Sequence, residues 1–270
     1  MTLKIAIAGA GGRMGRMLIQ AVSDNPACTL SGALEHDASP LLGQKAAAMI
    51  GYGGGPDVLI SADRSVAFAG ADVVIDFTLP SATLENMQSA REVGAAVVLG
   101  TTGHTDGQED VILGFSEQIP MIWAANYSMG VNLLLNLVEK AAAALPMNFD
   151  IDILEMHHRQ KIDAPSGTAL VLGKAAAKGR QQEFDAVKQL SREGETGQRP
   201  SGEIGFATLR GGTVPGDHMV VFAGEDERIE IGHRAGDRQI FARGAVQAAT
   251  WLAGKSPALY TMNDVLGLTD

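Results

Sequence analysis

The chain has 270 residues, of which 46% are hydrophobic and 19% charged, and its formal net charge is −10. This length allows one large or two ordinary domains with a substantial core, and the composition is typical of a soluble globular protein rather than a disordered one. The negative charge argues against nucleic-acid binding by bulk electrostatics. A single cysteine, Cys28, excludes an internal disulfide and fits a reducing compartment.

Targeting, membrane and metal signals are weak throughout the sequence. The N-terminus begins a strand at Leu3 without a basic, apolar leader, so we expect a cytoplasmic protein. No apolar run approaches the ~20 residues that a membrane span requires. One cysteine and scattered histidines give no spacing typical of metal ligands. We therefore expect no membrane, nucleic-acid or metal partner.

The first predicted element is a buried strand over Leu3–Ala8, which runs into a glycine-rich turn and then a helical pattern from Met17 to Val22. Such a unit opens a dinucleotide-binding βαβ fold, because glycines let the backbone approach a pyrophosphate and the helix N-terminus supplies N–H groups. The glycines stand at 9, 11, 12 and 15, and Met14 departs from the G-x-G-x-x-G spacing. Taken alone, this motif is weak evidence.

An acidic residue strengthens the dinucleotide interpretation. A second strand, Leu30–Glu35, ends in Glu35, at the distance where NAD-binding folds place a carboxylate on the adenosine ribose. His36 rather than arginine follows it, so only a partial charge is available to a 2′-phosphate. The sequence indicates that NADH is at least accepted and leaves NADPH open. An exposed carboxylate at a strand end is the alternative interpretation of Glu35.

The alternation of strands and helices continues to about residue 125. Strands are predicted over Ala71–Phe77, Ala95–Leu99 and Met121–Ala125, and the first intervening helix begins near Pro80 with Ser81 as its expected cap. Strands separated by helical stretches predict a parallel, doubly wound sheet, in which ligands bind at the carboxyl ends of strands. Four segments rich in glycine or small residues follow such ends, which favours a nucleotide: Gly9–Gly15, Glu35, Gly100–Gly103 and Ala124–Tyr127.

The most informative segment is Glu155–Ala169, with the sequence EMHHRQKIDAPSGTA. It follows a predicted helix, Met129–Leu145, and a predicted buried strand, Phe149–Leu154, and it leads into another helix near Pro165–Thr168. Strand, cationic loop and helix N-terminus gather positive charge and free N–H groups at one point. This arrangement suits a small substrate with carboxylates and a proton donor beside it, whereas a solvated basic loop is the alternative.

Histidine chemistry fits such a site. A hydride acceptor gains electron density, and a positioned histidine can supply a proton near neutral pH. His157 and His158 at a strand end point to opposite sides, so at most one faces the reacting atoms, and the residues alone do not choose between them. Lys161 and Arg159 can hold carboxylates. The helix start adds backbone N–H groups at 167 and 168.

The second half of the chain changes character. Residues 180–203 are polar and irregular, and three strands, Ile204–Arg210, His218–Phe222 and Arg228–Ile231, are predicted to form a meander. The last helix, Gln239–Gly254, is expected to return to the first domain. We therefore predict an α/β protein with an N-terminal Rossmann-type doubly wound parallel sheet, formed by 1–128 and 238–270, and a second, strand-rich α+β domain at 129–237.

Over essentially its whole length the chain resembles the 4-hydroxy-tetrahydrodipicolinate reductases, also called dihydrodipicolinate reductases, of diaminopimelate and lysine biosynthesis. The segments that match the family are Gly9–Gly15, Asp76–Thr78, Gly100–Gly103, Ala124–Ser128, Ser191–Gly194, Ile204–Ala207 and Glu155–Ala169. The last of these, Glu155–Ala169, is highly specific.

The resemblance implies hydride transfer from NADH or NADPH to a cyclic dicarboxylate, with loss of its hydroxyl as water. It assigns His157 as the catalytic acid/base, Lys161 as the proton donor, and His158, Gly167 and Thr168 as substrate contacts. It also implies a homotetramer and closure of the two domains over the substrate. The cofactor contacts that it implies are Gly9, Ala10, Gly11, Gly12, Arg13, Met14, Glu35, Gly100, Thr101, Thr102, Ala124, Ala125, Asn126 and Tyr127.

Two departures from the family pattern are visible. His36 stands where some members have arginine, and Tyr127 stands where phenylalanine is frequent. Two other functions compete with the reductase: another Rossmann dehydrogenase for amino acids or sugars, and a regulator that senses NAD(H) without chemistry. The first does not account for the His-His-Arg-x-Lys segment joined to Pro-Ser-Gly-Thr, and the second makes that segment an interaction surface.

Overall fold

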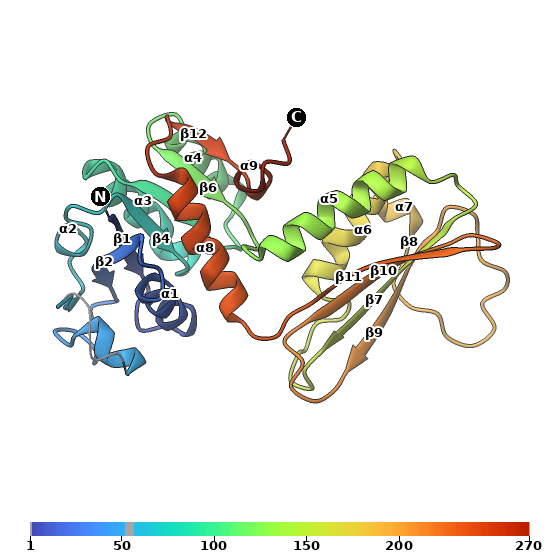
Figure 1. Cartoon of the computed structure of the whole chain (residues 1–270), viewed down its shortest axis with the longest axis horizontal. Helices are drawn as coiled ribbons and strands as arrows, with labels where there is room; N and C mark the ends of the chain where they lie inside the picture. The colour runs from blue at the N-terminus through green and yellow to red at the C-terminus, as the bar shows by residue number, and fades with distance from the viewer. Residues whose placement is uncertain (1, 52–56, 270) are drawn as a thin grey trace. The chain divides into compact units, whose positions relative to one another are not determined.

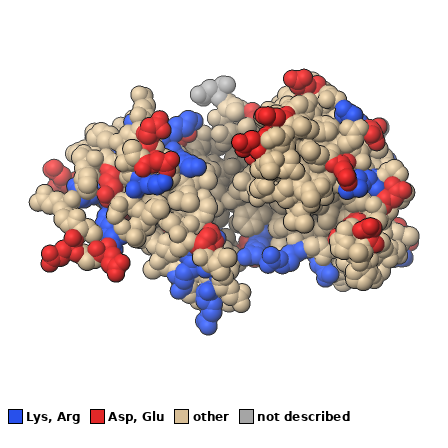
Figure 2. All heavy atoms as spheres, turned by 180° about the vertical axis from the view of Figure 1, so that it is seen from behind, with Lys and Arg blue, Asp and Glu red and all other residues tan. Residues whose placement is uncertain are grey.

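A computed structural model describes residues 2–51 and 57–269 and divides the chain into two compact units (Figure 1). Unit 1 consists of Met1–Met129 and Gln239–Asp270, and unit 2 is Gly130–Arg238. Each boundary falls one residue after the predicted one. On the face seen in Figure 2, acidic and basic side chains are both scattered over the surface.

Unit 1 contains a seven-stranded sheet in the order β12-β6-β5-β4-β1-β2-β3. Every pairing in it is parallel, as the alternation of elements predicted. The strand bounds are β1 Leu3–Ala8, β2 Cys28–Leu34, β3 Ile60–Ser61, β4 Val73–Asp76, β5 Ala96–Leu99, β6 Pro120–Trp123 and β12 Ala258–Tyr260.

Helices cover both faces of this sheet, as a doubly wound fold requires. Alternate residues of β1 point to opposite faces, so Ile5 and Ile7 pack in one core with α1 and α8, and Ala6 and Ala8 in another with α3 and α4. The helices of unit 1 are α1 Arg13–Ser23, the 3₁₀ helix η1 Ala46–Ile50, α2 Arg64–Ala67, α3 Pro80–Glu92, α4 Asp106–Phe115, α8 Gln239–Leu252 and α9 Met262–Leu266.

Unit 2 is a five-stranded mixed sheet with α5 and α6 on one face (Figure 1). Apolar residues of α5, α6 and the sheet share one core. The element bounds are α5 Met129–Ala144, which begins at the last residue of unit 1, β7 Asp150–His157, α6 Gly167–Gly179, α7 Phe184–Val187, β8 Lys188–Gln189, β9 Ile204–Arg210, β10 Asp217–Ala223 and β11 Arg228–Arg234.

The predicted meander is wrong. The strand order is β11-β10-β7-β9-β8, so β7 separates β9 from β10. It pairs antiparallel with β10 and parallel with β9, and only β10 and β11 form a hairpin. The burial of β7 alternates strictly, and its inward residues, such as Ile151 and Ile153, are fully buried. Local alternation fixes which face is buried, but not which strand lies alongside.

The expected cap of α3 is also wrong. Leu79 is the N-cap residue, and Pro80 occupies the first helical turn, so Ser81 already lies inside the helix. Proline is favoured at this position because its missing N–H has no partner within the helix and its fixed φ suits the helix start.

The strand β7 runs further than predicted and includes Glu155 and His157, which places both side chains on a regular element.

Candidate functional site

The turn after β1 brings a helix start close to a strand end. Gly9 has a φ of +74°, in the left-handed region that favours glycine. Gly12 caps α1 without any side-chain hydrogen bond, so the helix N-terminus keeps its free N–H groups. A Cβ on Gly15 would lie 2.1 Å from the carbonyl oxygen of Gly9. The turn therefore depends on the absence of side chains.

Glu35 closes the far side of this turn. Its carboxylate accepts hydrogen bonds from the backbone N–H groups of Gly11, at 2.6 Å, and of His36, at 3.1 Å. A Cβ on Gly11 would come within 2.6 Å of the Glu35 Oε2 and within 2.5 Å of Leu41. The end of β2, the glycine turn and the Glu35 carboxylate thus pack tightly together.

A cavity of about 700 Å³ opens beside the glycine turn and Glu35. It brings together three of the predicted cofactor contacts, Gly9, Gly12 and Glu35, although Ala10 is fully buried and Arg13 is exposed. Among the other lining residues, only His36 had been considered for cofactor binding; the full set is Leu34, His36, Asp37, Ala62, Arg64, Phe77, Thr78, Leu79, Ser81, Ala82, Glu85 and Asn86.

The other predicted cofactor segments follow β5 and β6 and lie outside the lining of this cavity. Phe77, which lines the cavity, lies next to both segments. Its ring centroid is 5.4 Å from that of Tyr127, and a Cβ on Gly100 would lie 2.3 Å from the Phe77 ring. The Tyr127 hydroxyl is buried within hydrogen-bonding distance of the carbonyl oxygens of Leu99 and Ile122, and burial raises its pKa. The Tyr127 side chain is therefore part of the core, and the absence of a side chain at Gly100 makes room for the Phe77 ring.

A buried carboxylate organises the loop after β4. Asp76 is 1% exposed and accepts hydrogen bonds from the backbone and hydroxyl of Thr78, from the Thr101 hydroxyl and from the Asn86 amide. Asn86 in turn accepts a hydrogen bond from Arg64. Because these residues come from different strand ends and helices, Asp76 fixes the shape of the cavity wall.

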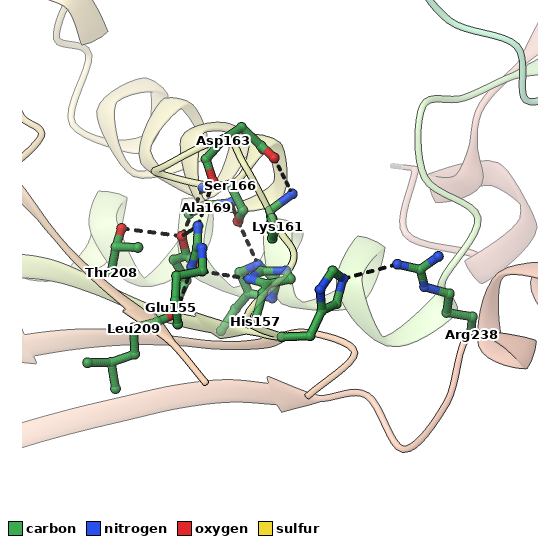
Figure 3. A network of polar contacts seen from close by, with 12 residues as sticks. Glu155, His157, Lys161, Asp163, Ser166, Ala169, Thr208, Leu209 and Arg238 are labelled. Carbon is green, nitrogen blue, oxygen red and sulfur yellow. Dashed lines mark hydrogen bonds and ion pairs between the residues drawn. The ribbon is translucent and has the colours of Figure 1, made fainter. Parts of the chain in front are cut away.

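In unit 2, the end of β7 carries a buried histidine–carboxylate pair (Figure 3). His157 Nδ1 lies 2.6 Å from Glu155 Oε2, and the two residues are 8% and 1% exposed. Arg210, which pairs with His157 across β9 and β7, contacts both oxygens of Glu155 at 2.7 and 2.8 Å. The backbone N–H of Ser166 donates to the same carboxylate at 3.0 Å.

The next residues turn away from this pair. His158 Nε2 lies 3.2 Å from Arg238 Nη2, and since an arginine can only donate, the His158 nitrogen accepts. Lys161 forms an ion pair with Asp163 at 2.8 Å, while Arg159 is exposed. His157 and His158 therefore face different partners, in agreement with the alternation expected at a strand end.

The N-terminus of α6 lies beside these side chains. Ser166 caps it by accepting from the Ala169 N–H at 3.2 Å. A Cβ on Gly167 would meet nothing within 4 Å, so its backbone opens onto free space, and Thr168 is half-buried. The Ser166 hydroxyl also contacts His218 Nε2 at 3.0 Å, which ties the helix start to β10.

Burial controls protonation around His157. Burial lowers the pKa of His157 and outweighs the opposing effect of the Glu155 carboxylate, and Lys161 and Arg210 lower it further. For Glu155, burial alone would raise the pKa, but hydrogen bonds from Arg210, His157 and Ser166 outweigh it and hold the pKa below its usual range. Burial lowers the pKa of His218 to about 4. His218 is therefore neutral at neutral pH.

Sequence reasoning assigned no role to Glu155, Arg210, His218 or Arg238 in this site. Glu155 was visible as part of the motif, and its position two residues before His157 on a strand placed it on the same face. Arg210, His218 and Arg238 carried no such signal, because they lie more than fifty residues away along the chain and only the sheet order and the end of unit 2 bring them here.

The part of the chain that the structure describes, 2–51 and 57–269, contains no group of three or more His, Cys, Asp or Glu residues arranged to hold a metal ion. Over the same residues, no helix is both long and apolar enough to cross a membrane.

Two models of one protein family match almost the whole chain. The model of the dihydrodipicolinate reductase N-terminus matches residues 3–127, and that of its C-terminus matches residues 130–266. The chain belongs to the dihydrodipicolinate reductase family. The resemblance stated from the sequence motifs is thereby confirmed.

Relatives of this family align end to end with the chain. A 4-hydroxy-tetrahydrodipicolinate reductase of Rhodopseudomonas palustris is 51% identical over 268 residues, covering 99% of this chain and 98% of that protein. One of Afipia carboxidovorans is 52% identical over 267 residues, covering 98% and 97%. No large insertion or missing domain separates this chain from them.

A solved structure agrees with the fold. A dihydrodipicolinate reductase of Paenisporosarcina sp. TG-14, solved with dipicolinate bound, has a TM-score of 0.78 and 26% identity, covering 97% of this chain and 98% of that one. An amine dehydrogenase of Mycobacterium smegmatis shares the fold alone, with a TM-score of 0.60 and 10% identity. The predicted fold class, a Rossmann-type sheet with a second strand-rich domain, is confirmed.

Proposed function

We propose that this protein reduces 4-hydroxy-2,3,4,5-tetrahydrodipicolinate to tetrahydrodipicolinate with NADH or NADPH, in lysine and diaminopimelate biosynthesis. Its family membership over the whole chain supports the reaction. The observation that carries the proposal is the histidine, lysine and arginine cluster beside the α6 N-terminus, at the end of β7. A dicarboxylate substrate requires such a cluster, whereas a sensor of NAD(H) does not.

The residues of unit 1 fit a dinucleotide. Gly11 and Gly15 leave no room for a Cβ, which keeps the turn close-packed, and the uncapped start of α1 offers N–H groups and positive potential to a pyrophosphate. Glu35 lies at the end of β2, where a ribose hydroxyl can donate to it. When bound, the nicotinamide supplies the hydride. The sequence-based contacts at Gly100–Thr102 and Ala124–Tyr127 remain part of this proposal.

The substrate is a dianion, and the cations of unit 2 match it. Lys161 is 21% exposed and Arg159 is exposed, so both can reach a carboxylate from the loop. Gly167 and Thr168 offer backbone N–H groups from the start of α6, where the helix dipole favours an anion. Arg238, held against His158, adds a cation from the end of unit 2.

The reaction consumes a proton, because substrate, NAD(P)H and one proton give product, NAD(P)⁺ and water. We assign the acid/base role to His157 and proton donation to Lys161. The Nδ1 of His157 faces Glu155, which leaves Nε2 for the substrate. A bound dianion favours the charged form of a neighbouring histidine, so substrate binding itself opposes the burial that lowers the pKa of His157. His158 then contacts substrate rather than transferring its proton.

Assembly and location are further parts of the proposal. We expect a cytoplasmic homotetramer in which subunits associate through the strand-rich units. The edge strand β11 supports this, because most of its residues are exposed and its outer edge has hydrogen-bonding groups that need partners. The mass in solution at micromolar concentration tests it, and a monomer would contradict it.

The test of function is turnover with substrate made in situ from pyruvate and aspartate semialdehyde by a coupled synthase. NADH and NADPH oxidation are followed for the wild type, His157→Ala and Lys161→Ala. We expect wild-type turnover and a loss of at least about 10²-fold in both variants, since a positioned acid contributes about 10²–10⁴ in rate. No wild-type turnover despite nucleotide binding would favour another dehydrogenase or a sensor.

A further inference from the structure

Glu155 is a carboxylate enclosed by hydrogen-bond donors. Its Oε1 accepts from Ser166 N–H at 3.0 Å, from the Thr208 hydroxyl at 3.3 Å and from Arg210 at 2.8 Å. Its Oε2 accepts from Arg210 at 2.7 Å and faces His157 Nδ1 at 2.6 Å. A buried carboxylate is costly unless it is paired and fully hydrogen-bonded, and here both oxygens are. Glu155 is therefore held ionised and in a fixed position.

An ionised carboxylate can only accept hydrogen bonds, so the proton on the His157 ring must be at Nδ1. The ring nitrogen that remains is Nε2. A Cβ on Gly216 would lie 2.9 Å from Nε2, so this glycine leaves the space beside that nitrogen free of a side chain. The position of Glu155 thus determines both the tautomer of His157 and the direction in which it can exchange a proton.

Arg210 connects this pair to the cationic loop. Its guanidinium contacts both oxygens of Glu155 and also donates to the backbone carbonyl of Asp163, two residues after Lys161. One side chain of β9 therefore fixes the carboxylate behind His157 and the segment that carries Lys161. A bidentate arginine gives a defined geometry that a lysine cannot reproduce.

The charges around His157 make Glu155 the balancing group. Lys161 from the loop and Arg210 from β9 are cations that disfavour a charged imidazole. His218 of β10 lies with its ring centroid 5.1 Å from that of His157, and it is neutral at pH 7, as described above. His233 of β11 lies beyond His218, and Asp163 is paired with Lys161. Glu155 is the negative group in direct contact with the His157 ring.

We propose that Glu155, clamped by Arg210, is a positioning residue for the reduction: it fixes the Nδ1–H tautomer of His157, aims Nε2 at the substrate and offsets the neighbouring cations. This inference rests on the proposed function, in which His157 is the acid. Glu155 itself does not touch the reacting atoms. It acts through His157, so its removal should change proton transfer rather than substrate affinity.

The first test is Glu155→Gln with Glu139→Gln as a matched control. Glu139 is paired with Lys178 in the same unit, so the control makes the same chemical change outside the site. A glutamine has one acceptor oxygen, so its amide must face a donor on one side. We expect kcat to fall by about 10²-fold or more, with KM changed by much less. The control should keep wild-type kinetics.

The pH profile separates positioning from a structural role. The rate that needs a charged His157 should fall at lower pH in Glu155→Gln than in the wild type, by about one pH unit or more, since the opposite charge is lost. Glu155→Asp keeps the charge and should retain more of the wild-type profile. A loss of kcat in proportion to the loss of folded protein, with an unmoved profile, would overturn the proposal.

A ¹⁵N NMR measurement of the histidine rings tests the proposal without turnover. The chain has six histidines, so His157 can be assigned by comparison with His157→Ala. We expect the Nδ1–H tautomer in the wild type and its loss in Glu155→Gln. If the protein does not reduce the substrate but shows this tautomer change, the proposed function fails and the local geometry stands. Normal turnover with an Nε2–H tautomer in the wild type contradicts the positioning role.

Discussion

The glycine turn of unit 1 and the histidine loop of unit 2 both join a strand end to a helix start, but they are built in opposite ways. The turn after β1 leaves its helix without a side-chain cap, and it depends on the absence of a Cβ at Gly11 and Gly15. The loop after β7 caps its helix with Ser166 and gathers charged side chains around Glu155. A backbone site suits the invariant pyrophosphate of a cofactor, whereas a side-chain site supplies protons and recognises a particular substrate.

The largest expected effect is a loss of kcat without a loss of dinucleotide binding. Lys161→Ala should lower kcat by about 10²–10⁴-fold while dinucleotide affinity stays within a few-fold of wild type, since the lysine belongs to the side-chain site. Asp163→Asn, which removes only the ion-pair partner of Lys161, should have a far smaller effect. Turnover and dinucleotide binding by titration check both. Equal loss of binding and kcat would break the contrast between the two sites.

A substitution in the glycine turn after β1 should instead weaken dinucleotide binding. In Gly15→Ala the added Cβ would meet two backbone carbonyl groups, so the start of α1 must move away from the turn. We expect dinucleotide affinity to fall by about 10²-fold, which corresponds to about 3 kcal/mol. Gly114→Ala, in α4, is the control, because its Cβ would meet nothing within 4 Å and alanine favours a helix. Unchanged affinity in Gly15→Ala would refute the backbone role.

Lowering the pH should reduce the free energy of unfolding, because buried histidines of the side-chain site must take up protons. The folded pKa of His218, about 4, lies below the usual 6.5, so the unfolded chain takes up the proton first as the pH falls. Its contribution to stability is present above pH 6.5 and is lost as the pH falls towards 4. In total this is about 3 kcal/mol, and His157 and His233 act in the same direction.

Denaturant unfolding of the wild type and of His218→Gln at pH 7 and pH 5 measures this effect. Glutamine can keep a hydrogen bond to Ser166 without titrating. We expect the wild type to lose about 2 kcal/mol more than the variant over this range. The same loss in both proteins would mean that His218 does not control the acid sensitivity.

The smallest expected effect concerns cofactor choice. His36 borders the cavity beside Glu35 and supplies only a partial positive charge, so His36→Arg adds a permanent cation near the position of a 2′-phosphate. We expect the KM for NADPH to fall by about tenfold relative to that for NADH, the value of one charge-assisted hydrogen bond. Steady-state kinetics with both cofactors measure the ratio, and an unchanged ratio would place the 2′-phosphate elsewhere.

Much of the fold could be predicted because the signals are local. Alternating strands and helices predicted the parallel sheet of unit 1, and β1 has the predicted bounds, Leu3–Ala8. Elements with short or weak patterns were missed, among them β3, β12 and α9. The parallel pairing of β9 with β7 was also missed, because hydrophobic periodicity shows which face is buried but not which strand is the neighbour.

The sequence by itself determined the segments at which we propose the chemistry: the glycines after β1, Glu35, and the His157–Lys161 segment before a helix start. These features are contiguous, so residue type and spacing reveal them. Only the tertiary structure decided how His157 is held, because Arg210 reaches Glu155 through the pairing of β9 with β7, and His218 reaches Ser166 through β10. Ion pairs and shared hydrogen bonds depend on distance in space, and separation along the chain does not specify that distance.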